Sequence, residues 1–252
     1  MRYEAEGFAQ RAQISEWIDE PCSYEEFRDS LCDLVRVNRL LLAYRPTLRW
    51  LGRLGVRARE TLHIVDVGCG AGDMLRRIEQ WARKKNIAVT LTGIDIHPHA
   101  TRAARELEED QSSSSDSGFD PAGAGSRIEW YTGEAYDYRP QAGIDVIVSS
   151  AFTHHLSDVE IVRFIRWMEQ TAQRGWFIND LHRTRHTYLA FRALASVMRW
   201  HRFVQHDGPI SIRRSFSRLD WMRLLKEAGL PEGSAAIETA WPGRLSVGRV
   251  KR

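Results

Sequence analysis

The chain has 252 residues, of which 43% are apolar and 27% are charged, a composition typical of one large soluble domain with elaborations or of two small ones. No apolar run approaches the roughly 20 residues that a bilayer span needs, and the first residues are charged and polar, so we expect neither a transmembrane segment nor a secretory signal. The three cysteines have no disulfide or metal-site spacing, which predicts a reduced, cytoplasmic protein.

The net charge of +3 hides an asymmetry along the chain. Residues 163–252 carry a charge of +10, and the residues before them carry −7. A basic C-terminal part is compatible with nucleic acid, an acidic partner, an anionic membrane surface or an anionic substrate. Arginines on solvated helix faces explain the same charge without any partner, so the charge alone decides nothing.

Residues 1–60 are expected to form a helical segment that caps the rest of the chain. Ser23 is an N-cap candidate with Glu26 three residues later, and Phe27 and Leu31 follow at helical spacing. Pro46 is expected to break or restart this helix.

From residue 61 onward, β-branched runs alternate with amphipathic stretches. This pattern predicts a parallel sheet with helices on both faces, and a terminal hairpin around a Pro-Gly turn adds an antiparallel edge. Ser217 and Gly229 are expected to cap and end the last helix. Two segments interrupt the alternation, a Ser/Gly/Asp/Pro-rich flexible loop at 111–126 and an insertion at 181–214. The expected strands cover 62–70, 89–98, 127–135, 144–152 and 175–180, and the helices cover 72–86, 99–110, 158–172 and 217–230.

The stretch IVDVGCGAGD contains Gly68, Gly70 and Gly72 directly after a predicted buried strand. A dinucleotide-binding loop carries its third glycine one position later, where this chain has Asp73. A carboxylate at the start of a helix would repel a pyrophosphate. S-adenosylmethionine has no phosphate and carries an ammonium, a sulfonium and a carboxylate, so nearby carboxylates are compatible with it or favour it.

Other residues at strand ends fit the same kind of ligand. Asp66 ends the first strand. Asp95 ends the next strand, where a carboxylate can accept hydrogen bonds from both ribose hydroxyls of either a dinucleotide or S-adenosylmethionine. Ile96 would cover an adenine face, and Glu134 and Ala135 would meet the adenine amino edge.

The stretches VDVGCGAGD, GIDIHP, TGEA and IDVIVSSAFTHHLSD, in this order, resemble the class I S-adenosylmethionine-dependent methyltransferases. Within that group they are most similar to the small-molecule branch related to the quinone-biosynthesis methyltransferases. The resemblance covers about residues 62–177 and the C-terminal helix and hairpin.

The resemblance implies an α/β, Rossmann-like, doubly wound seven-stranded sheet with its last strand antiparallel. S-adenosylmethionine, with S-adenosylhomocysteine as product, would lie across the carboxyl ends of the first, second and fourth strands. We count Ser150, at the end of the fourth strand, among the cofactor residues. The family more often has aspartate where this chain has Glu134, which shifts the expected adenine contact toward the backbone of Ala135.

Histidines near the expected methyl position are candidates for proton transfer, because the ordinary pKa of histidine is close to neutrality. His154 follows the fourth strand, and we predict it to be the catalytic base. His182, after the fifth strand, is a second catalytic candidate. His155 is expected to pack or to support the cofactor, and Asp180, like Asn179, is a candidate for orienting the substrate or the base.

A metal site is not predicted. His182 and His186 have the i, i+4 spacing that would suit a metal on a helix, but no third ligand is spaced to join them.

The insertion at 181–214 is the part of the sequence from which we infer the kind of acceptor. Arg185, Arg192 and Arg199 recur every seven residues, and a second face is apolar. We expect Tyr188, Phe191, Ala195 and Met198 to form this apolar stripe. A lid of this kind suits a hydrophobic or aromatic small molecule, and an amphipathic helix here is also compatible with peripheral membrane contact. A helix packed on the domain with a solvated arginine face is the plain alternative.

The sequence therefore predicts a methyltransferase that acts on an oxygen of a small aromatic, quinol or polyketide-like acceptor. Methylation of carbon is the nearest alternative. A nucleic-acid methyltransferase is disfavoured, because the fourth strand ends in SSAF rather than in the Asn/Asp-Pro-Pro-aromatic tetrapeptide of base-directed enzymes. A non-catalytic binder or an oxidoreductase on a similar fold is a further alternative. The sequence indicates no oligomeric state.

Overall fold

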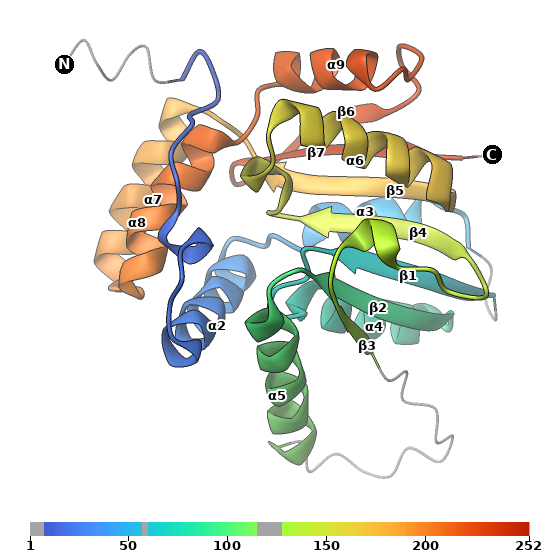
Figure 1. The fold of residues 1–252 in the computed structure, drawn as a ribbon, viewed down its shortest axis with the longest axis horizontal. Helices are drawn as coiled ribbons and strands as arrows, with labels where there is room; N and C mark the ends of the chain where they lie inside the picture. The colour runs from blue at the N-terminus through green and yellow to red at the C-terminus, as the bar shows by residue number, and fades with distance from the viewer. Residues whose placement is uncertain (1–7, 57–59, 115–127, 252) are drawn as a thin grey trace.

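The computed structural model describes residues 8–56, 60–114 and 128–251, and within these ranges a single seven-stranded sheet runs through the molecule (Figure 1). The strand order is β3-β2-β1-β4-β5-β7-β6. The strands are β1 (Thr61–Val67), β2 (Ala88–Asp95), β3 (Glu129–Thr132), β4 (Ile144–Ser150), β5 (Ala172–Leu181), β6 (Ala236–Ala240) and β7 (Arg244–Val250). Within the described residues, no helix has the length and apolar character needed to span a membrane.

The first five strands are parallel, whereas β7 is antiparallel to both β5 and β6. The predicted sheet with an antiparallel last strand and a C-terminal hairpin is therefore confirmed. Since the chain crosses from β1 outward to β2 and β3 and then returns to β4, the strand order reverses between β1 and β4. In open α/β sheets, ligands bind beyond the carboxyl ends of the strands at such a reversal.

Helices cover both faces of the sheet and bury an apolar core on each. On one face α6 (Asp158–Thr171) and α9 (Arg218–Glu227) pack through residues such as Phe164 and Trp221. On the other face lie α3 (Arg45–Gly52), α4 (Asp73–Lys85) and α5 (Pro98–Ser114), which contribute Trp50, Leu75 and Ala104. Part of the predicted N-terminal cap segment 1–60 thus packs on the sheet itself, through α3.

Several helix ends are where the sequence predicts them. Ser23 caps α2 (Tyr24–Leu40) in a capping box with Glu26, and Ser217 caps α9 in the same way with Asp220. Helix α2 ends before Pro46, which lies in the first turn of α3, so this proline restarts the helical path rather than interrupting a continuous helix. Gly229 follows α9 with a φ of 86°, as expected of a glycine that ends a helix.

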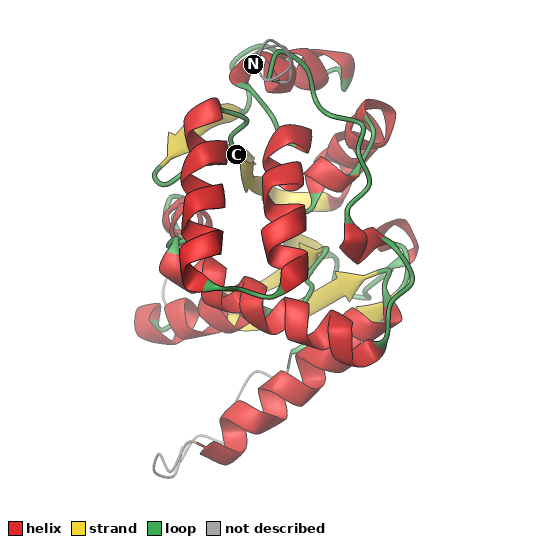
Figure 2. Ribbon diagram, turned by 90° about the vertical axis from the view of Figure 1, so that its left-hand side faces the viewer, coloured by secondary structure: helices red, strands yellow, loops and turns green. Residues whose placement is uncertain are grey.

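A helical cap lies over the carboxyl ends of the strands (Figure 1). It consists of α2, α7 (Arg185–Met198), α8 (Arg202–Arg214) and the segment that leads from residue 8 through the short helix η1 (Trp17–Asp19). Figure 2, which faces this end of the molecule, shows two of these helices standing side by side in front of the strands. A small core that includes Val37, Ala195, Trp200 and Val204 joins α2 to the helical pair, so the insertion is a packed part of the molecule.

Three details of the predicted elements are wrong. Residues 111–114 belong to α5 rather than to a flexible loop, and residues 115–126 lie outside the described residues. Arg199 is the C-cap of α7 with a φ of 48°, so it does not continue the helical arginine stripe. Met198 is exposed, because α7 ends there, whereas Ala195 of the same predicted stripe is buried.

Candidate functional site

A cavity of about 790 Å³ lies between the carboxyl ends of the strands and the helical cap. Its floor comes from the loop after β1 and from the ends of β2 and β4, and its roof comes from α2, α7, α8 and the segment around Glu16. The predicted cofactor residues in its wall are Gly68, Gly70, Asp95, Ile96 and Ser150. The size is within the range of sites for small molecules and cofactors.

The glycine loop turns back from β1 with positive φ angles that an L-residue with a side chain adopts only under strain. Gly68, Gly70 and Gly72 have φ angles of 71°, 49° and 71°. The loop is fixed to β2 because the Gly68 N–H donates to the Ile94 carbonyl at 2.9 Å. Packing also requires glycine at position 72, since a Cβ there would lie 2.1 Å from the Trp130 ring. Gly68 and Gly70 line the cavity, while Gly72 lies outside its lining and is the N-cap of α4.

Three carboxyl groups surround this loop. Asp95 Oδ2 accepts a hydrogen bond from the Gly70 N–H at 3.0 Å, and its Oδ1 accepts one from the His97 N–H at 2.9 Å. Asp66 is buried beside them, and within the described part of the chain its Oδ1 has no hydrogen-bond partner. Burial, together with the charges of Asp73 and Asp95, raises the pKa of Asp66 well above its ordinary value. Burial also raises the pKa of Asp95, although its two backbone hydrogen bonds act in the opposite direction. Asp66 therefore lies beside the loop among acidic groups whose charges oppose its ionisation.

His154 occupies the wall of the cavity in the turn after β4, in the short helix η3 (Thr153–His155), and is 3% exposed. Its Nδ1 lies 2.7 Å from Oδ1 of Asp180, which ends β5 beside β4. Asp180 also accepts hydrogen bonds from Thr153 Oγ1 at 2.6 Å and from the His154 N–H at 3.1 Å. The parallel pairing of β4 with β5 thus brings together the predicted base and the residue predicted to orient it.

The charge state of Asp180 fixes which nitrogen of His154 faces the cavity without a proton. Burial alone would raise the pKa of Asp180, but the charge and hydrogen bonds of His154 and the hydrogen bond of Thr153 outweigh it and hold the pKa well below its ordinary value. An ionised carboxylate only accepts hydrogen bonds, so Nδ1 of His154 carries the hydrogen. In the neutral ring, Nε2 is then a proton acceptor.

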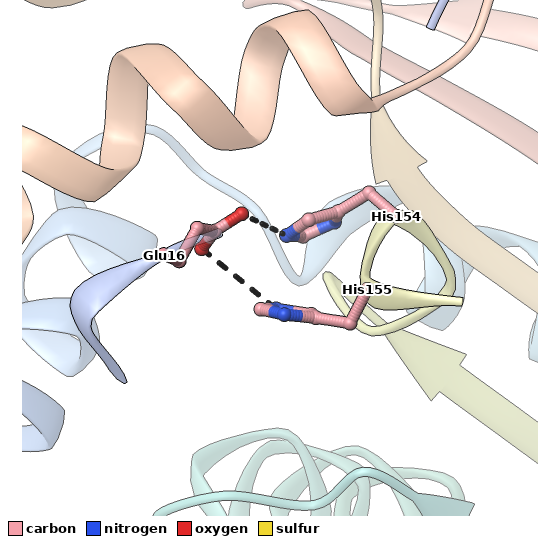
Figure 3. Close-up of side chains that lie close together, drawn as sticks. All are labelled: Glu16, His154 and His155. Atoms are coloured by element: carbon pink, nitrogen blue, oxygen red, sulfur yellow. Dashed lines mark ion pairs between the residues drawn. The ribbon is translucent and has the colours of Figure 1, made fainter. Parts of the chain in front are cut away.

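Glu16 faces both histidines from the N-terminal segment (Figure 3). One of its oxygens, Oε1, lies 3.8 Å from Nε2 of His154, and the other lies 4.0 Å from Nε2 of His155. Glu16 is 2% exposed, and Ser211 Oγ donates to its Oε2 at 2.9 Å. Burial raises the pKa of Glu16 from 4.5 to about 7, although the charges of His155 and Arg214 oppose this shift.

Two arginines hold the N-terminal segment and the histidine turn together. Arg11 Nε donates to the Arg214 carbonyl at 2.7 Å, and Arg11 Nη2 donates to the Leu156 carbonyl at 2.8 Å. Arg214 Nε in turn donates to the His154 carbonyl at 3.1 Å. The segment is also tied to α8, because Asp207 accepts the N–H groups of Trp17 and Ile18 at 2.9 and 3.0 Å. These hydrogen bonds hold the N-terminal segment in the position in which Glu16 lies beside His154 and His155.

Glu16, His154 and His155 are also the described residues whose ligand atoms come close enough to surround a metal ion. Tetrahedral bonds of about 2.0–2.1 Å would put the donor atoms about 3.4 Å apart, so the observed separations of 3.8 and 4.0 Å would have to contract. Arg214 Nη1 lies 3.6 Å from Oε1 of Glu16 and would repel a cation there. The arrangement therefore suits proton transfer better than metal binding, and the absence of a metal remains a prediction.

The second histidine pair does not have the geometry that the sequence implied. His182 precedes α7, which begins at Arg185, so His182 and His186 are not one turn apart on a helix. His182 lies outside the cavity lining, where its N–H donates to the Gly243 carbonyl at 2.9 Å. Burial and the charge of Arg183 lower the pKa of His182. Its predicted catalytic role therefore gains no support from the geometry.

The remaining predicted cofactor residues, Asp66, Glu134 and Ala135, lie outside the lining of the cavity. Ala135 is buried at the start of the short helix η2 (Ala135–Asp137), which follows Glu134. Their contact with an adenine edge remains a prediction.

Further residues of the cavity wall that the sequence did not reveal come from the cap and from the start of β7. Glu16, Asn38 and Arg244 line the cavity, yet none belongs to a motif or follows a parallel strand. The signal that could have found Glu16 is weak, an acid and an aromatic residue in an otherwise polar N-terminal stretch.

Comparison with known proteins places this site in a family. Residues 34–231 match the family model described as a methyltransferase domain. The trans-aconitate 2-methyltransferase of Mycobacterium tuberculosis is 29% identical over 154 residues, which are 60% of this chain and 49% of that protein. The chain thus spans about half the length of the curated relatives that it matches.

Solved structures show the same fold. A SAM-dependent methyltransferase from Aquifex aeolicus gives a TM-score of 0.57 at 17% identity, covering 90% of this chain and 98% of that one. The magnesium protoporphyrin IX methyltransferase from Synechocystis PCC 6803, solved with bound SAH, gives a TM-score of 0.54 at 13% identity, covering 100% and 94%. The sheet order, the glycine loop and the match over residues 34–231 agree, and the chain belongs to the methyltransferase-domain family.

Proposed function

We propose that this protein transfers a methyl group from S-adenosylmethionine to an oxygen of a small aromatic, quinol or polyketide-like acceptor by in-line displacement. The observation that carries the proposal is the pair His154–Asp180, with His154 in the wall of a cavity that also contains the glycine loop and Asp95. Methylation of a carbon in a similar acceptor is the alternative.

The residues around the glycine loop fit this cofactor. The charges of Asp73 and Asp95 repel a charge on Asp66, and one buried oxygen of Asp66 has no partner among the described residues. A ligand with an ammonium and a sulfonium relieves that repulsion, whereas a diphosphate would increase it. When bound, S-adenosylmethionine supplies a methyl group on a positively charged sulfur. Asp95 would hold the ribose hydroxyls, since its side chain lies at the end of β2 in the cavity wall.

His154 would take the proton of the acceptor hydroxyl at Nε2. The oxygen then attacks the methyl carbon, the carbon–sulfur bond breaks, and its electron pair stays on sulfur. Asp180 keeps the ring in the required tautomer and stabilises the imidazolium that forms, because its charge lies 2.7 Å from Nδ1. General base catalysis of this type contributes about 10²–10⁴-fold to a rate.

The cap would exclude water from the reacting groups. Side chains of α2, α7 and α8 give the cavity an apolar roof. When an oxygen bearing negative charge attacks a cationic centre, charge disappears in the transition state, and an apolar surrounding favours that change. The roof consists of residues such as Leu34, Val35, Phe191, Leu194, Phe203 and Ile212.

The same roof supports a hydrophobic or aromatic acceptor, as in the quinone-biosynthesis branch. Proteins with this fold include enzymes whose names specify a porphyrin and N-acetylserotonin, and the curated relatives are named for trans-aconitate. Their range supports a small-molecule acceptor and disfavours nucleic acid. Exposed Leu189, Val197 and Met198 on α7 support peripheral contact with a membrane surface, from which a lipid-like acceptor would enter. We retain a cytoplasmic location as part of this proposal.

The test is methyl transfer with purified protein, S-adenosylmethionine and a panel of phenols and hydroquinones, followed by mass spectrometry of the products. His154→Ala is expected to lower kcat by about 10²–10⁴-fold while leaving the affinity for S-adenosylhomocysteine nearly unchanged. His99→Ala, outside the cavity lining, is the matched control and is expected to keep its turnover. Full activity of His154→Ala, or loss of activity only in His182→Ala, would contradict the assignment of His154 as the catalytic base.

A further inference from the structure

Arg244 is a buried cation in the cavity wall that the proposed reaction does not use. It is the first residue of β7, follows the turn at Trp241–Gly243, and is 5% exposed. Its Nη2 donates to Oδ1 of Asn38 on α2 at 3.1 Å. Its Nη1 is buried and has no hydrogen-bond partner among the residues that the structure describes.

The nearby carboxylates do not satisfy this guanidinium. Asp73 Oδ2 accepts hydrogen bonds from Asn38 Nδ2 at 3.1 Å and from the Tyr44 hydroxyl at 2.7 Å. Asp180, as described above, accepts from Thr153 and His154. Burial lowers the pKa of Arg244, and the charges of Asp180 and Asp73 oppose that shift from a distance.

An arginine has five N–H donors and stays charged, so leaving one donor buried without an acceptor is costly. Arginines in such positions are suited to carboxylates, whose two oxygens match the planar guanidinium. The position also fits a ligand in the cavity, because Asn38 connects Arg244 to Asp73 at the start of α4, directly after the glycine loop.

We propose that Arg244 forms a carboxylate-binding subsite in the cavity, with Asn38 holding the guanidinium in place. This inference rests on the proposed function, because it deepens the description of the same cavity. The carboxylate has two sources, the amino-acid part of S-adenosylmethionine or an acid group on the acceptor. In either case the ligand brings the acceptor oxygen that the described residues do not provide for Nη1.

The experiment measures dissociation constants by calorimetry for wild type, Arg244→Gln and Arg244→Lys. The probes are S-adenosylhomocysteine, 5′-methylthioadenosine, which lacks the amino-acid carboxylate, and pairs of aromatic or aliphatic acids with their amides. Arg185→Gln, an exposed arginine of α7, is the control and should change none of these values.

Two outcomes support the subsite and identify its source. If Arg244→Gln weakens S-adenosylhomocysteine about 10- to 100-fold and leaves 5′-methylthioadenosine unchanged, the carboxylate belongs to the cofactor. If Arg244→Gln leaves the dissociation constants of both nucleosides unchanged but abolishes the tighter binding of the acids relative to their amides, the carboxylate belongs to the acceptor. In both cases Arg244→Lys, which keeps the charge, should retain part of the effect.

Two other outcomes overturn the subsite. Unchanged binding of every probe by a folded Arg244→Gln protein would show that no carboxylate uses Arg244. An equal loss for both nucleosides would show that Arg244 only ties α2 to β7. Wild-type protein that binds neither nucleoside would contradict the proposed function instead, so the two failures are distinguishable.

Discussion

The buried carboxyl of Glu16 makes the stability of the fold depend on pH in a way that a single substitution removes. Burial raises the pKa of Glu16 from 4.5 to about 7 in the folded chain. Between these two values the native state binds more protons than the unfolded state, so the free energy of unfolding falls as pH rises. The contribution of Glu16 is fully present below about pH 4.5 and is lost as pH rises through about 7.

The size of the effect follows from the shift. From 4.5 to about 7 is roughly 2.5 pKa units, which at about 1.4 kcal/mol per unit gives a change on the order of 3 kcal/mol. Glu16→Gln removes the titration while keeping an oxygen that can accept the hydrogen bond of Ser211 Oγ. The stability of wild type minus that of the variant should therefore fall by about 2–3 kcal/mol between pH 5 and pH 8.

Urea unfolding at several pH values, with the free energy extrapolated to water, measures this difference. Glu25→Gln, an exposed glutamate of α2, is the control and should leave the pH dependence of wild type unchanged. A difference between wild type and Glu16→Gln that stays constant from pH 5 to pH 8 would refute the burial of this carboxyl against the two histidines.

Three further predictions concern Asp95, the glycine loop and the residue that positions His154. Asp95→Ala should weaken S-adenosylhomocysteine binding by about 1–3 kcal/mol, the cost of losing charged hydrogen bonds, and unchanged affinity by calorimetry would remove Asp95 from the site. Gly72→Ala should destabilise the fold by about 1–3 kcal/mol, because φ is 71° and the new Cβ would lie 2.1 Å from the Trp130 ring; a thermal midpoint equal to that of wild type would contradict this. Asp180→Asn should lower kcat by at least 10²-fold with cofactor affinity nearly preserved, and a loss confined to KM would contradict its role in holding the base.

The fold was predictable because its signals are local. β-Branched runs, capping residues and the glycine loop predict the elements, and their alternation predicts the sheet and the reversal of strand order beside the site. The sequence placed His154 after the fourth strand and Asp180 near the end of the fifth, and the parallel pairing of β4 with β5 brings the two residues together. These inferences needed only positions along strands and the rule that parallel strands end at one edge.

The parts that escaped prediction depend on contacts between segments far apart in the chain. Glu16 reaches the histidines only because Asp207 of α8 and the arginines Arg11 and Arg214 fix the N-terminal segment, an arrangement that no periodicity encodes. The predicted arginine stripe failed at Arg199, because α7 ends one residue earlier and the chain turns into α8. Arg244 lies in the cavity wall because β7 pairs antiparallel with β5, and the sequence does not specify the register of that pairing.

The most direct test of the account is a crystal structure of the protein with S-adenosylhomocysteine bound. The account predicts electron density in the 790 Å³ cavity, with the ribose hydroxyls within hydrogen-bonding distance of Asp95 and the sulfur on the side of the cavity that holds Nε2 of His154. A cavity that stays empty at saturating ligand, or a ligand bound away from the glycine loop, would contradict it.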